Sequence, residues 1–117
     1  YWSELDVTTY VNWEDFCEKN PGAKIYMATT KGRHVYTEVS YEPDCYIMFG
    51  KESAGIPEEI LVEHKENCVR IPMWGDIRSL NLSNSVAIVL YEALRQNGFE
   101  KMNMEGHLHR LHWKDEV

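Results

Sequence analysis

Short apolar segments alternate with helix-forming segments along the chain, and this alternation restricts the fold more than any other feature of the sequence. Three apolar segments stop at a turn residue, as buried strands do: residues 23–30 (AKIYMATT), 44–49 (DCYIMF) and 68–73 (CVRIPM). Residues 7–11 (VTTYV) predict a further short strand, and residues 36–40 predict an edge strand or a loop. Capping and turn residues predict the helices: from Asn12 to residues 20–22, from Pro57, and over residues 82–97.

This order of elements predicts an α/β fold, in which a parallel sheet is covered by helices on both faces. A length of 117 residues with 44% hydrophobic side chains fits one domain with one core. Ligands of such sheets bind beyond the carboxyl ends of the strands. Those ends lie at Thr29, Gly50 and Ile71, so we expect the functional site there.

The first two strand ends carry glycine-containing turns. Residues 28–32 (ATTKG) read as an ordinary turn, whereas residues 49–57 (FGKESAGIP) place two glycines around an acidic residue before a helix. Gly50 allows a ligand to approach the backbone closely, and Gly55 allows a turn that other residues would strain to make. The spacing matches neither G-x-G-x-x-G nor a P-loop, so a phosphate cradle is not expected.

The third strand end is followed by small polar residues and then by a continuous apolar run. One reading makes Ser83, Asn84 or Ser85 the N-cap of the last helix, but capping does not account for the whole string of small polar residues. Residues 86–90 (VAIVL) are too continuously apolar for a helix with one buried side. We therefore expect this helix to be buried on several sides.

The net charge of −7 argues against a protein that coats nucleic acid by bulk electrostatic attraction. Any contact with RNA must then be local. Several cations do lie near the glycine-containing turns, although a scattered solvated surface explains them equally well: Lys31, Arg33, Lys51, Arg70 and Arg78.

The three cysteines, Cys17, Cys45 and Cys68, are odd in number and widely spaced, which favours a reducing cytoplasm over a disulfide framework or a zinc site. No apolar stretch approaches the length of a membrane span. His107, His109 and His112 lack metal-site spacing and partners, so we expect a solvent-exposed tail and no metal.

Three segments in this order resemble the cofactor-binding motifs of the SPOUT family of RNA 2'-O-methyltransferases: FGKESAGIP, RIPM and RSLNLSNSVAIVLYEALRQNGF. The last is especially similar to the subgroup of tRNA (cytidine/uridine-34 2'-O)-methyltransferases. The resemblance covers essentially the whole chain, which is read as one methyltransferase domain over residues 1–117, and the His-rich tail matches least.

The resemblance implies a deep C-terminal trefoil knot, a topology that periodicity does not reveal. It also implies S-adenosylmethionine as cofactor, with S-adenosylhomocysteine as product. Backbone groups and apolar side chains would line that cofactor at eight positions: Ala28, Met48, Gly50, Ile71, Met73, Ser79, Leu80 and Asn81.

The reaction implied is the attack of a ribose 2'-oxygen on the methyl group of the cofactor, at wobble nucleotide 34 in the anticodon loop of a tRNA. The candidates for catalysis are Glu52, Asn81, Ser83 and Tyr91, and the candidates for contact with RNA are Lys51 and Arg78. The family pattern also implies a homodimer in which the last helix lies at the subunit interface.

Proteins of this family begin with a strand and a helix that carry an Asn- and Arg-containing motif, and no such segment precedes Tyr1. We therefore expect that an N-terminal unit is missing from the sequence. Two alternatives stay open: a catalytically incomplete fragment or RNA-binding relative that keeps only the cofactor fold, and an unrelated small α/β nucleotide-binding module.

Overall fold

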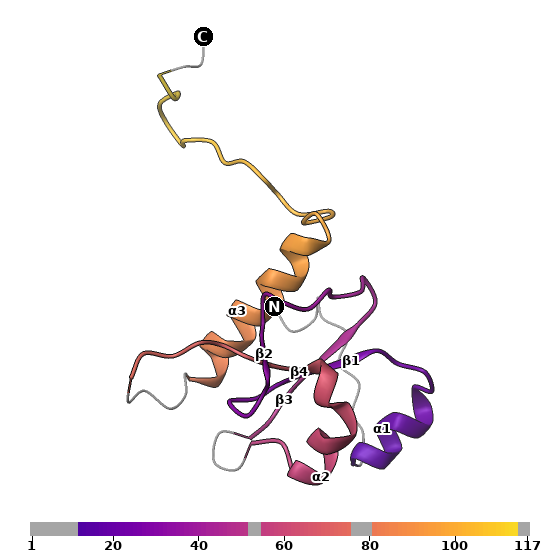
Figure 1. Ribbon diagram of the computed structural model, residues 1–117. Coiled ribbons are helices and arrows are strands. Elements are labelled where there is room, and N and C mark those ends of the chain that lie inside the picture. Colours follow the sequence, from indigo (N-terminus) through magenta and orange to yellow (C-terminus); the bar gives the residue numbers. More distant parts are fainter. Residues whose placement is uncertain (1–11, 52–54, 76–80, 115–117) are drawn as a thin grey trace.

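The structure is a computed structural model that describes residues 12–51, 55–75 and 81–114 (Figure 1). Four strands form one sheet: β1 (Ile25–Ala28), β2 (His34–Val35), β3 (Tyr46–Phe49) and β4 (Cys68–Arg70). Their order is β2-β4-β1-β3, and all three pairings are parallel. The predicted parallel sheet is confirmed, whereas the predicted strand at residues 7–11 lies outside the described residues.

The edge strand β2 ends just before the segment in which an edge strand or a loop was expected. Val35 pairs with Arg70 of β4, and the next residue, Tyr36, donates its backbone N–H to the Arg70 carbonyl over 2.9 Å. Residues 36–40 then form turns. The loop alternative is therefore correct, and the edge strand lies at His34–Val35.

Side chains of β1 alternate between two apolar cores, one on each face of the sheet. Ile25 and Met27 pack with α1 (Trp13–Lys19) and α2 (Glu58–Leu61) on one face. Tyr26 packs with α3 (Leu82–Gln96) on the other face, where Val89 and Ala93 complete the core. The sheet is thus covered on both faces, as expected (Figure 1).

The first two helices begin as the sequence predicts. The side chain of Asn12 caps α1 by accepting the backbone N–H of Asp15 over 2.8 Å. Pro57 immediately precedes α2, which has only one turn and continues as the 3-10 helix η2 (Val62–Asn67). Non-helical backbone angles at His64 interrupt η2, and the helix predicted from Pro57 is confirmed over Glu58–Leu61.

The start of α3 corrects the predicted cap. Asn81, rather than Ser83, Asn84 or Ser85, is the N-cap residue, and its side-chain oxygen accepts the Ser83 N–H over 2.8 Å. The three following polar residues can adopt helical angles because Asn81 already stands at the boundary in an extended conformation, with φ −53° and ψ 142°.

The expectation that α3 is buried on several sides is wrong for the single chain. One side of the helix packs on the sheet through Val89 and Ala93. On the other side, Leu90 and Tyr91 are 42% and 53% exposed. The continuous apolar run therefore supplies a core contact on one side and an apolar surface on the other.

Polar side chains hold the end of α3 to the loop that precedes β3. Gln96 accepts the Tyr41 N–H over 2.9 Å and donates to the Val39 carbonyl over 3.0 Å. Glu92 is buried, and its carboxylate accepts hydrogen bonds from Arg95 and from Gln96. We call Glu92, Arg95 and Gln96 the polar clamp, because they fix one end of α3 against residues 39–41.

The turn after β3 folds back on itself at Gly50. Lys51 pairs with Gly55, whose N–H donates to the Lys51 carbonyl over 2.8 Å. A Cβ atom on Gly50 would lie 2.3 Å from the carbonyl carbon of Gly55 and 2.4 Å from the nitrogen of Ile56. Gly50 is thus required by the close approach of the chain's own backbone, while Gly55, at φ +70°, makes the unusual turn as predicted.

We predict that Gly50→Ala destabilises the protein by about 3 kcal/mol, because backbone atoms on both sides of the turn would have to move apart. Urea denaturation measures the loss in the free energy of unfolding. Gly106→Ala is the matched control, since a Cβ at Gly106 meets nothing within 4 Å, and it should change stability by less than about 0.5 kcal/mol. Equal stability of the two variants would contradict this account of the turn.

The polar clamp also predicts a pH dependence. Hydrogen bonds from Arg95 and Gln96 hold the pKa of Glu92 below its ordinary value of 4.5. The stabilisation is therefore complete above pH 4.5 and is lost as the pH falls through the lower pKa of the folded state. Glu92→Gln should show a smaller loss of stability between pH 5 and pH 3 than the wild type.

The free energy of unfolding, measured in urea at several pH values, tests this pH prediction. Glu59→Gln, which changes an exposed carboxylate on α2, is the control and should keep the wild-type slope. Parallel curves for the wild type and Glu92→Gln would show that the clamp carboxylate does not contribute.

Candidate functional site

The three predicted strand ends meet at one edge of the sheet. Ala28, the last residue of the central strand β1, pairs with Phe49 of β3 on one side and with Val69 of β4 on the other. Ala28, Phe49 and Val69 thus lie in one row across the sheet. Gly50 lies one residue beyond this row, and Ile71 lies two residues beyond it. Since neighbouring strands lie about 5 Å apart, β3 and β4 end about 10 Å from each other.

Two of the predicted cofactor residues also share a face of the sheet. Ala28 and Ile71 are partly buried in the core that α3 covers, together with Phe49. Met48 instead packs in the other core, beside Met27. The structure therefore brings Ala28, Gly50 and Ile71 together, and it places the Met48 side chain on the opposite face.

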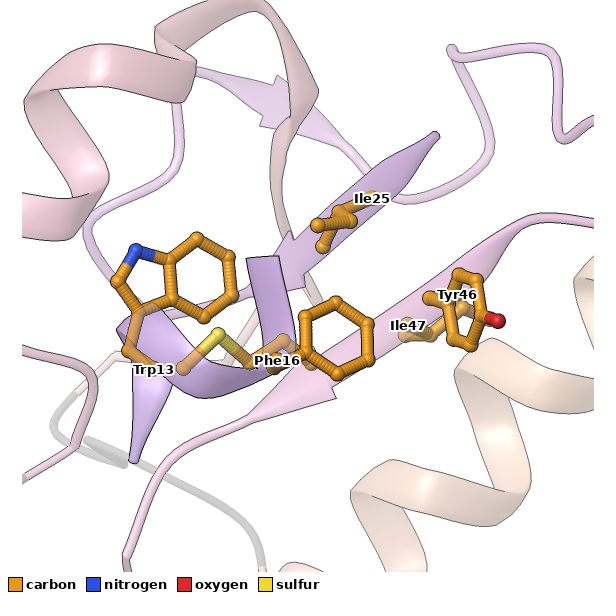
Figure 2. A pocket seen from close by; sticks show the side chains of 6 residues that line it. Trp13, Phe16, Ile25, Tyr46 and Ile47 are labelled. Carbon is orange, nitrogen blue, oxygen red and sulfur yellow. The ribbon is translucent and has the colours of Figure 1, made fainter. Parts of the chain in front are cut away.

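The Met48 side chain lines an apolar cavity of about 260 Å³ between α1 and the strands β1 and β3. Figure 2 shows Trp13 and Phe16 of α1 beside the sheet residues Ile25 and Tyr46. Ile25 and Tyr46 are the first residues of their strands, and the lining extends along β3 as far as Met48. It is distinct from the strand-end site.

The segment after β4 carries Met73 and leads toward the start of α3. Met73 is half-buried, whereas Trp74 beside it is 88% exposed. At the start of α3, the Asn81 side-chain oxygen is engaged with the Ser83 N–H, and Ser83 itself is exposed. Asn81 thus has a structural task in addition to the predicted role at the cofactor, and the Ser83 side chain faces solvent.

Tyr91 lies far along α3 from these two residues. An α-helix rises about 1.5 Å per residue, which puts Tyr91 about 15 Å from Asn81 along the helix axis. Its ring is 53% exposed on the side of α3 that does not face the sheet. One chain therefore does not bring Tyr91 together with Asn81 and Ser83.

The charges near the strand ends are partly neutralised. Lys31 forms an ion pair of 2.8 Å with Glu58 at the start of α2, and the hydrogen bond from Lys31 lowers the pKa of the Glu58 carboxyl. Lys51 is exposed at the end of β3. Of these two lysines, Lys51 is therefore better placed to meet an anionic ligand.

Four predicted site residues lie outside the described residues: Glu52, Arg78, Ser79 and Leu80. Within the part of the chain that the structure describes, no group of three or more His, Cys, Asp or Glu side chains could hold a metal ion. The same part contains no helix long and apolar enough to span a bilayer. The three histidines of the tail are exposed, as expected.

The sequence did not lead us to predict the polar clamp or the exposed position of Trp74. Glu92 and Gln96 follow Val89 at helical spacing, which places them next to the buried side of α3. Polar residues at such positions are the pattern that could have indicated the clamp. Trp74 carried no periodic signal, because it lies in a segment without regular secondary structure.

Comparisons with known proteins identify the family of the chain. The family model described as the SpoU rRNA Methylase family matches residues 1–91. A Listeria innocua protein named "Putative tRNA (cytidine(34)-2'-O)-methyltransferase" is 44% identical over 118 residues, which cover 98% of this chain and 70% of the relative.

Solved structures are similar as well. A "putative RNA methyltransferase" from Bacillus anthracis superposes with a TM-score of 0.82 at 38% identity, covering 89% of this chain and 67% of that protein. An AdoMet-bound rRNA methyltransferase from Sinorhizobium meliloti gives a TM-score of 0.61 at 32% identity, covering 72% of this chain and 33% of that one. The resemblance read from the sequence is thus confirmed, and the chain belongs to the SpoU methylase family.

Proposed function

We propose that this protein transfers a methyl group from S-adenosylmethionine to the ribose 2'-oxygen of nucleotide 34 in a tRNA. The convergence of Ala28, Gly50 and Ile71 at one edge of the sheet is the observation that carries this proposal. The Listeria innocua relative also supports the proposal, because its name specifies cytidine 34 of tRNA.

The chemistry of the strand ends fits the cofactor. Adenine and ribose are held well by main-chain N–H and C=O groups together with apolar contacts. Ala28, Ile71 and Met73 provide half-buried small or aliphatic side chains, and Gly50 provides backbone with no side chain. We assign these residues to the cofactor, with Ser79, Leu80 and Asn81 as further members of the predicted set. Met48 can contribute only its backbone, because its side chain lies on the opposite face of the sheet.

In the proposed reaction, a bond forms between the ribose 2'-oxygen and the methyl carbon while the carbon–sulfur bond breaks, and the 2'-hydroxyl proton passes to a base. S-adenosylmethionine supplies a methyl group that its sulfonium already activates. The protein must then hold the two reactants in line, which contributes about 7 to 11 kcal/mol in favourable cases. A general base adds a factor of about 100 to 10000.

The candidate catalytic residues differ in what they can do. Asn81 has no basic group and fixes the start of α3, so it fits a positioning role. Burial raises the pKa values of the Cys45 and Cys68 thiols. Both thiols therefore stay protonated and are unsuited to accept the 2'-hydroxyl proton. The proposed candidates for proton transfer remain Glu52, Ser83 and Tyr91. The proposed contacts with RNA are Lys51 and Arg78.

We further propose that two copies associate through the exposed side of α3. Leu90 and Tyr91 form an apolar surface there, and Tyr91 is too far from Asn81 to join the same site in one chain. Association would bring Tyr91 of one copy to the site of the other. We place the reaction in the cytoplasm, in keeping with the free cysteines Cys17, Cys45 and Cys68.

Methyl transfer to tRNA tests the proposed function directly. The full-length protein should bind S-adenosylmethionine in a calorimeter and transfer its labelled methyl group to tRNA, with the modified ribose mapped to nucleotide 34. A tRNA with 2'-deoxyribose at that nucleotide is the matched control and should accept no methyl group. A folded protein that binds the cofactor but methylates no RNA ribose would instead be a relative that keeps only the cofactor fold.

Sedimentation equilibrium tests the proposed dimer. Leu90→Glu should convert the wild-type dimer to a monomer, because it places a charge in an apolar interface. Val62→Glu is the control, since Val62 is 71% exposed on η2, away from α3, and its variant should stay dimeric. A Leu90→Glu variant with the mass of the wild type would show that this side of α3 is not the interface.

A further inference from the structure

Trp74 is the most exposed large hydrophobic side chain of the described residues, at 88%. It lies between Met73 and Gly75, in a segment with no regular secondary structure. None of the ring contacts within residues 12–51, 55–75 and 81–114 involves it. A tryptophan buries about 150–250 Å² when it packs, so this ring leaves a large stacking surface open.

The position of Trp74 distinguishes it from an ordinary exposed side chain. Single exposed apolar residues are common and need no function. Trp74, however, comes four residues after the end of β4, directly beside the proposed cofactor residue Met73. An RNA ribose that reaches the proposed cofactor site approaches this edge of the sheet, and Trp74 directly follows a residue of that site in the sequence.

We infer that Trp74 is a stacking platform for a base of the RNA substrate, next to the ribose that receives the methyl group. This inference rests on the proposed function and adds a residue that orients the substrate. Unpaired bases of RNA loops are commonly recognised by stacking on aromatic side chains. Stacking fixes a nucleotide without using its hydrogen-bonding edge, which suits a reaction at the sugar rather than at the base.

The charge of the chain favours such a platform. With a net charge of −7, the protein gains little from bulk attraction to phosphates. Lys51 is exposed at the end of β3, but Lys31 is paired with Glu58. Base stacking does not depend on charge, and it would add affinity to the local contacts proposed for Lys51 and Arg78.

The experiment measures binding and methylation of an anticodon stem-loop RNA by the full-length protein. Trp74→Ala should weaken RNA binding and raise KM for RNA by about tenfold or more, whereas Trp74→Phe, which keeps a ring, should retain most of the affinity. The affinity for S-adenosylmethionine in the absence of RNA should stay unchanged. Trp113→Ala removes another exposed tryptophan, 53% exposed in the tail, and should leave KM at the wild-type value.

Salt dependence separates stacking from attraction to phosphate. The loss of affinity in Trp74→Ala should be the same at low and high salt, while Lys51→Ala should reduce the dependence of affinity on salt. The fluorescence of the wild type should fall on RNA binding, and this fall should be smaller in Trp74→Phe.

Unchanged KM and RNA affinity in Trp74→Ala, alongside methylation by the wild type, would overturn this inference and leave the proposed function intact. A change from dimer to monomer in Trp74→Ala would also overturn it, since the ring would then belong to a subunit interface. A wild-type protein that binds no RNA would overturn both proposals.

Discussion

The parallel pairing of β1 with two neighbours is the constraint on which the rest of the structure depends. β1 pairs with β3 along its whole length and with β4 at its carboxyl end, so backbone hydrogen bonds set all three strand ends in one register. Because side chains alternate along a strand, the same four residues also supply both apolar cores. The candidate site thus exists because the strands pair in this register. Each strand contributes a single residue to it.

Two sets of close contacts fix the turn after β3 and the C-terminal end of α3. At Gly50 the chain folds back so tightly that no side chain fits, which fixes the turn after β3. At the far end of α3, the polar clamp joins Gln96 to the backbone of residues 39–41. The C-terminal end of α3 is therefore anchored, because buried polar groups are satisfied there and a displacement would leave them unpaired.

Family membership and geometry support the functional proposal in different ways. The family match covers residues 1–91, and the chain spans 70% of the Listeria innocua relative, so the comparison applies to most of that protein. The geometry says which residues of this chain meet at the sheet edge. It also separates Tyr91 from Asn81 by about 15 Å, which is why the proposal requires a second copy of the chain.

The sequence by itself determined the α/β class, the limits of α1, the C-terminal end of α3 and, to within one residue, the three strand ends, because apolar periodicity and turn residues are local signals. Only the tertiary structure decided the strand order β2-β4-β1-β3, the face on which Met48 lies, and the reason for Gly50. It also showed that Asn81 caps α3 and that one side of α3 is open. These features depend on contacts between residues far apart in the chain, and local patterns carry no information about which distant segment fills a given space.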